Sequence, residues 1–149
     1  MQPLVRRYLK TAIAFLGVGL ALGVWMLVRR EAWGIWPTPY LTSAHTHAIL
    51  VGFVMMMILG VALWMFPRPA RDDTRFRPAL AEAAYWLVTG GTAARLAGEV
   101  GRSAGGGTAL RVLVLAGGVA QAAGIGLFFL TMWSRIRSPG SVVRQQDAR

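Results

Sequence analysis

The fold follows from one uncharged run of sequence, Ala44-His-Thr-His-Ala-Ile-Leu-Val-Gly-Phe-Val-Met-Met-Met-Ile-Leu-Gly-Val-Ala-Leu-Trp-Met-Phe66. A helix needs about 20 mostly apolar residues to cross roughly 30 Å of hydrocarbon, because backbone groups without hydrogen-bond partners are too costly in lipid. Pro67 and Pro69 end the run, since proline cannot continue a helix. Residues 44–66 are therefore predicted to form a transmembrane helix.

Three further apolar runs flank this helix, at about 11–28, 79–97 and 110–133. The first is not followed by the small-residue cleavage site of a signal peptide, so we expect it to be retained. The run at 79–97 is the weakest, because Glu82 and Arg95 lie near its two ends, where long side chains reach the membrane surface. The sequence predicts an all-α transmembrane four-helix bundle over residues 1–137, and a disordered tail at 138–149.

The composition indicates that lipid is the solvent of this chain. Of the 149 residues, 55% are hydrophobic and only 15% are charged, and the mean hydropathy of +0.49 is too high for a soluble domain of this length. The net charge of +10 lies in short basic clusters between the apolar runs, which argues against nucleic acid as a partner. Cysteine is absent, so the chain cannot build a disulfide, an iron–sulfur cluster or a covalently attached c-type haem.

Arginine and lysine predict how the bundle lies in the membrane. The N-terminus carries three of them, the loop at 68–77 four and the C-terminal tail four, against five on the opposite side. By the positive-inside rule, both termini and the 68–77 loop are cytoplasmic. The linker at 30–43 is then on the outer face, where Trp33 and Trp36 form an interfacial aromatic belt, and the helix at 44–66 runs from outside to inside.

Glycines recur in all four runs. Small residues let transmembrane backbones approach closely, so we expect these glycines to mark contacts between helices. They are Gly19, Gly23, Gly52, Gly60, Gly90, Gly91, Gly117, Gly118 and Gly124.

His45 and His47 are the two histidines of the chain, and they lie at the outer end of its most hydrophobic run. Ionisable groups inside a span are rare and usually functional, which favours a ligand role over a structural one at the interface. Residues two apart on a helix differ by about 200° in direction and about 3 Å in height, so one ion cannot be held by both imidazoles. Each is predicted to serve a separate partner. Haem suits such a histidine, because it is a large apolar plate that fits between helices.

The stretch Ser43-Ala-His-Thr-His-Ala-Ile-Leu-Val-Gly-Phe53, continued by Phe66-Pro-Arg68, resembles the haem-ligand helix of subunit I in haem-copper oxidases, especially nitric oxide reductases. In that family, a helix running from outside to inside carries His-x-His with a glycine five residues after the second histidine. The two histidines hold the high-spin and the low-spin haem on opposite sides of the helix. The resemblance therefore implies cofactor-binding roles for His45, His47 and Gly52.

The chain departs from subunit I in size, since it resembles only one of the three pseudo-equivalent groups of four helices in that subunit. It has no further histidine to hold copper, so no copper is expected. A closed ring of three chains would imitate one subunit I, and His45 of one chain with His47 of the next could then hold one b-type haem, giving one haem per chain. A twofold dimer is the rival assembly, with one haem held by the same histidine from both chains.

Haem propionates at the outer surface would need cationic or aromatic donors. The resemblance implies an arginine pair for this task and favours Arg29 and Arg30, with Trp36 at the same level. Contact with lipid headgroups is an equally good interpretation of these arginines.

Two other groups of residues are interpreted without chemistry. The three consecutive methionines at 55–57 point in three directions, which indicates packing rather than a metal site. Glu82 and Glu99 could relay protons, but each is near a helix end, where a solvated charge is the ordinary explanation.

The leading functional hypothesis is a membrane b-type cytochrome that moves single electrons, with quinol or a redox protein as its partner, because two axial histidines leave no open position on the iron. Three alternatives stay open. They are a small oxidase or nitric oxide reductase-like enzyme, a haem or gas sensor or assembly subunit, and a structural membrane subunit whose histidines only cap a helix. The resemblance also implies the bacterial plasma membrane as the location.

Overall fold

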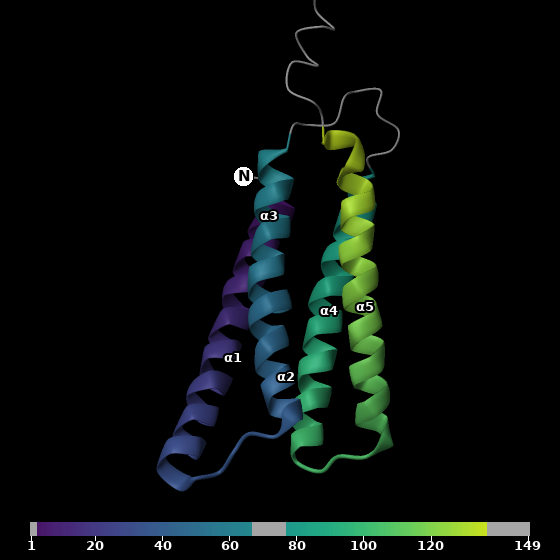
Figure 1. Cartoon of the computed structure of the whole chain (residues 1–149). Helices are drawn as coiled ribbons and strands as arrows, with labels where there is room; N and C mark the ends of the chain where they lie inside the picture. The colour runs from purple at the N-terminus through teal and green to yellow at the C-terminus, as the bar shows by residue number, and fades with distance from the viewer. Residues whose placement is uncertain (1–2, 67–76, 137–149) are drawn as a thin grey trace, which may run out of the picture.

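The computed structural model of the protein describes residues 3–66 and 77–136, and all of its regular structure is helical. The elements are α1 (Pro3–Trp33), α2 (Pro39–His47), η1 (Ala48–Met55), α3 (Met56–Met65), α4 (Pro78–Ser103), α5 (Thr108–Met132) and η2 (Trp133–Arg135). Because α2, η1 and α3 follow one another without a break, they form one continuous rod, and the described residues fold as four long rods that lie side by side (Figure 1). The predicted all-α class is confirmed.

Three of the four rods are long and apolar enough to cross a membrane: α1, the continuous rod Pro39–Met65, and α5. The predicted runs at 11–28, 44–66 and 110–133 coincide with these rods except for their last residues, 66 and 133, and each rod extends beyond its run at one end or both. The run at 79–97 lies on α4. With 26 residues this helix is about as long as α5, which has 25, but it carries more charged side chains. That α4 also crosses the membrane stays a prediction, and the tail predicted at 138–149 lies outside the described residues.

The rods pack as two pairs. α4 and α5 make the most extensive contact in the molecule, and α1 lies along η1 and α3. The two pairs meet in a core of fully buried side chains, to which α1 contributes Tyr8, α3 Met56, α4 Val88 and α5 Phe128. Met56 is fully buried in this core, and Met55 and Met57 pack against the core, so the methionine run serves packing as predicted.

Glycine allows the close approach of α4 and α5. A Cβ on Gly91 would lie 2.8 Å from the backbone nitrogen of Gln121 and 2.8 Å from the carbonyl oxygen of Gly117. A Cβ on Gly124 would lie 2.9 Å from the backbone nitrogen of Val88. Real side-chain carbons do not approach backbone atoms this closely, so the prediction that glycines mark helix contacts is confirmed at these positions, whereas Gly90 faces open space.

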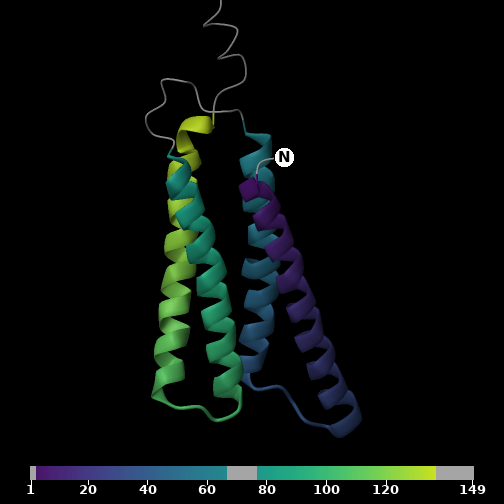
Figure 2. The same ribbon diagram turned by 180° about the vertical axis from the view of Figure 1, so that it is seen from behind.

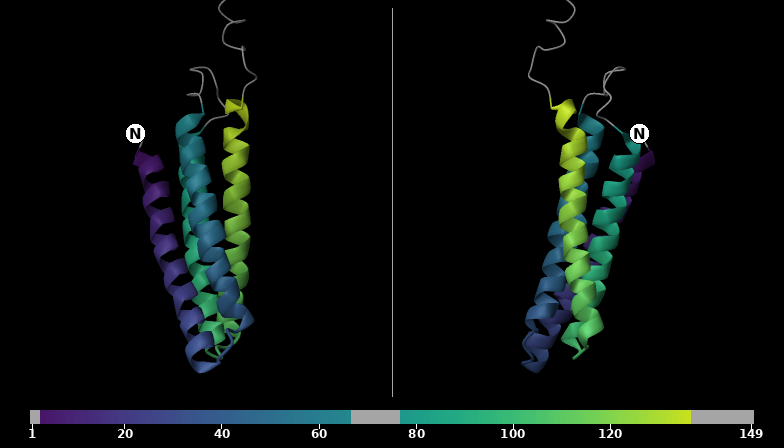
Figure 3. Two further views of the ribbon diagram at one scale, coloured as in Figure 1. Left: turned by 60° about the vertical axis from the view of Figure 1, so that its left-hand side comes forward. Right: turned by 90° about the vertical axis from the view of Figure 1, so that its right-hand side faces the viewer.

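The two ends of the bundle differ. The start of α1, the end of α3, the start of α4 and the end of α5 lie together at one end (Figures 1 and 3). There, Arg135 of η2 donates to the carbonyl oxygens of Leu63 and Phe66 and so ties α5 to the end of α3. At the opposite end, which we call the histidine end, α1 diverges from α2 (Figures 1 and 2). Which end is cytoplasmic stays a prediction.

The backbone changes pitch directly after the histidines. In η1 the helix widens to a π-helix, in which an N–H bonds to the carbonyl five residues before it, as the N–H of Met56 does to Val51. The segment contains Gly52, whose Cβ position is occupied by the ring of Phe15 from α1, at 2.6 Å from Cγ. Single π-turns in helices are frequent at functional sites, and here the wide segment separates the histidine turn from α3.

Candidate functional site

The two histidines lie on the last turn of α2, and the start of this helix is fixed by its own sequence. Thr38 is the N-cap, and its hydroxyl accepts a hydrogen bond from the backbone N–H of Leu41 at 3.3 Å. Pro39 follows at the first helical position, where its fixed backbone angle suits the helix and no N–H is needed. The rod therefore begins one turn before the apolar run, which sets the directions of both imidazoles.

His45 faces α1. Its Nδ1 lies 2.8 Å from the carbonyl oxygen of Gly19. The ring also lies over Gly23, where an added Cβ would be only 2.9 Å from the Cε1 atom of the imidazole. Two glycines one turn apart on α1 thus make the space and supply the hydrogen-bond acceptor for this ring.

His47 faces α4, on the other side of the rod. Its Nδ1 lies 2.8 Å from the carbonyl oxygen of Ser43, one turn earlier in α2. The hydroxyl of Ser43 donates to Oε1 of Glu99 at 2.7 Å, and Oε2 of the same carboxylate is 3.9 Å from Nδ1 of His47. The opposed directions that the spacing predicts are therefore present in the structure.

The hydrogen bonds determine which ring nitrogen is free. A carbonyl oxygen can only accept, so Nδ1 of each histidine carries the proton and donates it to a backbone carbonyl. Each Nε2 then keeps its lone pair, and neither has a hydrogen-bond partner among residues 3–66 and 77–136. A histidine that ligates a metal usually has this arrangement, with one nitrogen held by a carbonyl and the other on the metal. The donor set fits haem iron, which takes one imidazole on each face.

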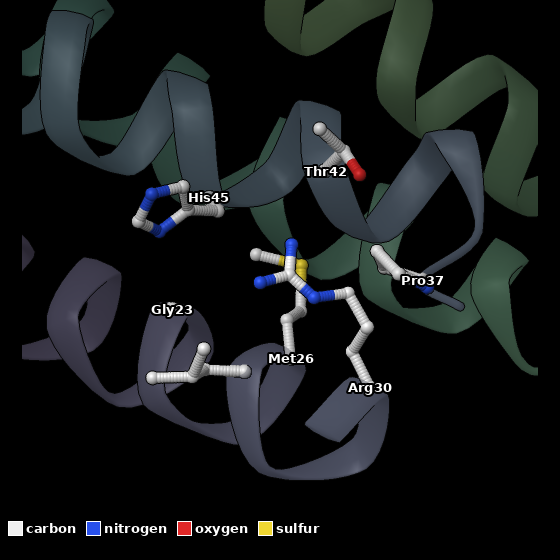
Figure 4. Close-up of a pocket in the computed structure, with 7 residues that line it drawn as sticks. Gly23, Met26, Arg30, Pro37, Thr42 and His45 are labelled. Carbon is white, nitrogen blue, oxygen red and sulfur yellow. The ribbon is translucent and has the colours of Figure 1, made fainter. Parts of the chain in front are cut away.

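A cleft of about 380 Å³ opens between α1 and α2 beside His45. This volume is within the range of about 300–1,000 Å³ that is usual for ligand sites. The Arg30 and Met26 side chains reach from α1 into the space beside the imidazole (Figure 4). The lining residues are Gly23, Met26, Leu27, Arg30, Pro37, Thr42 and His45.

Among the predicted propionate residues, Arg30 and Trp36 lie together. The Arg30 guanidinium is 5.6 Å from the centre of the Trp36 ring, and its Nε donates to Glu31 at 2.7 Å. Arg29 instead lies over Trp25, 5.9 Å from its ring centre, and does not line the cleft. The structure thus brings Arg30 and His45 to one cleft with Trp36 adjacent, while Arg29 lies outside it.

The remaining predicted residues lie elsewhere on the rod. Gly52 is a full turn past His47 and packs against α1, as described above. His47 is on the face opposite the cleft. The part of the chain that the structure describes has no group of three His, Cys, Asp or Glu side chains that could hold a metal ion.

Sequence reasoning missed one residue beside this site. Glu99 was interpreted as a solvated charge near a helix end, and this interpretation is wrong, because Glu99 is only 2% exposed. Its Oε1 accepts from Nε of Arg95 at 3.0 Å as well as from Ser43. The spacing Arg95 to Glu99, one turn apart, is the signal that indicates a pair. Glu82, by contrast, is half exposed and pairs with Arg7 at 2.7 Å, as expected of a solvated charge.

Comparison with models of protein families gives a match over most of the chain. The family model described as Cytochrome C and Quinol oxidase polypeptide I matches residues 3–145, which is nearly the whole chain. No curated protein and no solved structure matches the chain.

Proposed function

Because the chain belongs to the family of polypeptide I of cytochrome c and quinol oxidases, we propose that it is a membrane protein that binds b-type haem between neighbouring chains and transfers single electrons. Members of this family bind haem, and three rods of the chain are suited to a membrane. The haem iron would be held by His45 of one chain and His47 of the next. The proposed location is the bacterial plasma membrane, with both termini cytoplasmic.

One observation carries the proposal. Two imidazoles point in opposite directions from one turn of a membrane rod. In each, the Nδ1–H donates a hydrogen bond to a backbone carbonyl, and the lone pair of Nε2 is left to bind iron. A single chain can offer only one of them to any one haem, so a haem with two histidine ligands requires a second chain. A closed ring of three chains uses every histidine, whereas a twofold dimer leaves half of them unused, and we favour the ring.

The residues of the chain would position and tune the cofactor. The carbonyls of Gly19 and Ser43 hold the two rings in one orientation and make each Nε2 a better donor. Arg30, with Trp36 against it, is better placed than Arg29 to meet a propionate beside His45. When bound, the haem supplies one-electron redox chemistry. Two histidine ligands would leave no position on the iron for a substrate, so quinol or a redox protein is the proposed electron partner and no copper would be required.

The test measures haem in the purified full-length protein by absorption and pyridine haemochrome. We expect a b-type spectrum near one haem per chain. Either His45→Ala or His47→Ala alone should abolish bis-histidine ligation at every site, because each haem would use both residues. Thr46→Ala is the matched control, since Thr46 lies between them and its exposed hydroxyl bonds only to the carbonyl of Thr42, at 2.9 Å.

Two results would count against the proposal. If the double variant His45→Ala/His47→Ala kept the haem content and the spectrum of the control, the two histidines would not be the ligands of the haem. If the wild-type iron bound CO or NO readily in the reduced state, it would have an open position, and an oxidase or nitric oxide reductase-like enzyme or a gas sensor would be the better assignment.

A further inference from the structure

Glu99 is a buried acid at the histidine end, in contact with the ring that the proposed function assigns to iron. Its side chain is directed from α4 toward α2, and the two helices pack directly on each other there. Burying a carboxylate is costly unless it is paired and hydrogen-bonded. Oε1 has both a hydroxyl donor from Ser43 and a guanidinium donor from Arg95, at 2.7 and 3.0 Å.

The second oxygen of Glu99 is different. Oε2 is buried and has no hydrogen-bond partner among the described residues. Nδ1 of His47 lies 3.9 Å from this oxygen. The unpartnered side of the carboxylate is therefore turned toward the imidazole, while its partnered side is turned toward Ser43 and Arg95.

Arg95, the partner of the carboxylate, belongs to a series of polar contacts between α4 and α5. NH1 of Arg95 is 3.5 Å from Oε1 of Gln121, and Nε2 of Gln121 donates to the hydroxyl of Thr92 at 3.0 Å. Gly117 makes room for this arrangement, because a Cβ there would lie 2.7 Å from the backbone nitrogen of Arg95. The guanidinium that bonds to Glu99 is thus itself hydrogen-bonded to α5.

We propose that Glu99 is a positioning residue that lowers the reduction potential of the haem bound by His47, an inference that rests on the proposed function. A negative charge beside an axial imidazole favours the ferric state, which carries one more positive charge than the ferrous state. The effect is strong because the site is buried, where charges are weakly screened. Arg95 donates to Oε1, whereas the oxygen near His47 is Oε2, so the guanidinium only partly offsets the negative charge beside the imidazole.

The test is a redox titration of the purified, haem-loaded full-length protein. Glu99→Gln should shift the ratio of reduced to oxidised haem on the order of tenfold toward reduced at a fixed ambient potential, which for one electron is a rise of 59 mV. Glu99→Asp keeps the charge and should stay close to the wild-type potential. Glu82→Gln is the matched control, because Glu82 is an exposed acid on the same helix and should leave the potential unchanged.

The outcomes separate this inference from the proposed function. Haem that is bound with an unchanged potential in Glu99→Gln overturns the inference alone, whereas wild-type protein without haem overturns the proposed function. If Glu99→Gln does not accumulate, Arg95→Gln/Glu99→Gln takes its place, since it leaves no buried charge without a partner. The double variant also loses the positive charge of Arg95, so its reduction potential should rise less than that expected for Glu99→Gln. It should still rise, because the lost carboxylate is the charge nearer His47, and an unchanged potential would overturn the inference.

Discussion

Gly23 offers a sharp test of how His45 is held, because a single methyl group reaches the ring. In Gly23→Ala the new Cβ would lie 2.9 Å from Cε1 of His45, whereas ordinary contacts of this kind begin at 3.4 Å. The ring must therefore retreat by about 0.5 Å, the difference between these distances, and the 2.8 Å bond from Nδ1 to the carbonyl of Gly19 would lengthen or break.

The expected cost follows from that bond. Losing a carbonyl that orients a metal-bound histidine typically costs about 10–100-fold in metal affinity. We therefore expect Gly23→Ala to weaken haem binding by about this factor, as measured by absorbance titration of haem into the apoprotein. Gly17→Ala is the matched control on the same helix, because its Cβ would meet nothing within 4 Å. If both variants bound haem with equal affinity, the contact of His45 with α1 would have no part in holding the cofactor.

Two further predictions concern stability and need no cofactor. Gly91→Ala should lower the free energy of unfolding by about 1–3 kcal/mol relative to Gly90→Ala. The reason is that the new Cβ meets backbone atoms of α5 at position 91 but nothing at position 90. Equal thermal midpoints of the two variants in detergent would show that α4 and α5 can separate freely. Tyr8→Phe should keep or raise the free energy of unfolding, by up to about 3 kcal/mol, because the buried Tyr8 hydroxyl has no hydrogen-bond partner among the described residues. A clear loss of stability on calorimetry of Tyr8→Phe would mean that the hydroxyl is paired.

Sequence reasoning predicted the helical class, the methionine packing and four membrane spans, three of which lie on rods that are long and apolar enough to cross a membrane, because apolar runs in lipid have few alternative structures. It placed the start of the histidine helix too late. The apolar run begins at Ala44, whereas the helix begins at Pro39, where the cap of Thr38 stabilises a polar first turn. The π-helical segment was not predicted, since η1 reads as an ordinary apolar run.

The opposed directions of the imidazoles could be predicted because they depend only on positions two apart in one helix. Their hydrogen-bond partners could not. Gly19 is 26 residues from His45 in sequence, and its carbonyl is indistinguishable from any other until α1 and α2 are packed together. The burial of Glu99 depends in the same way on α2 covering α4, so its charge alone indicated a solvated position.

The wide helical segment η1 has a consequence for how the direction of the two imidazoles is encoded. Each residue of an α-helix turns the chain by about 100°, and a π-turn accommodates one residue more than an α-turn. The angle between the histidine turn and the buried side of α3, which carries Met56 and Leu59, is therefore set by the number of residues in η1. Deleting one residue there would rotate both rings about the axis of the rod, although none of the residues around them would be substituted. An insertion or deletion in η1, rather than a substitution, is therefore the simplest route to a new orientation of the two imidazoles.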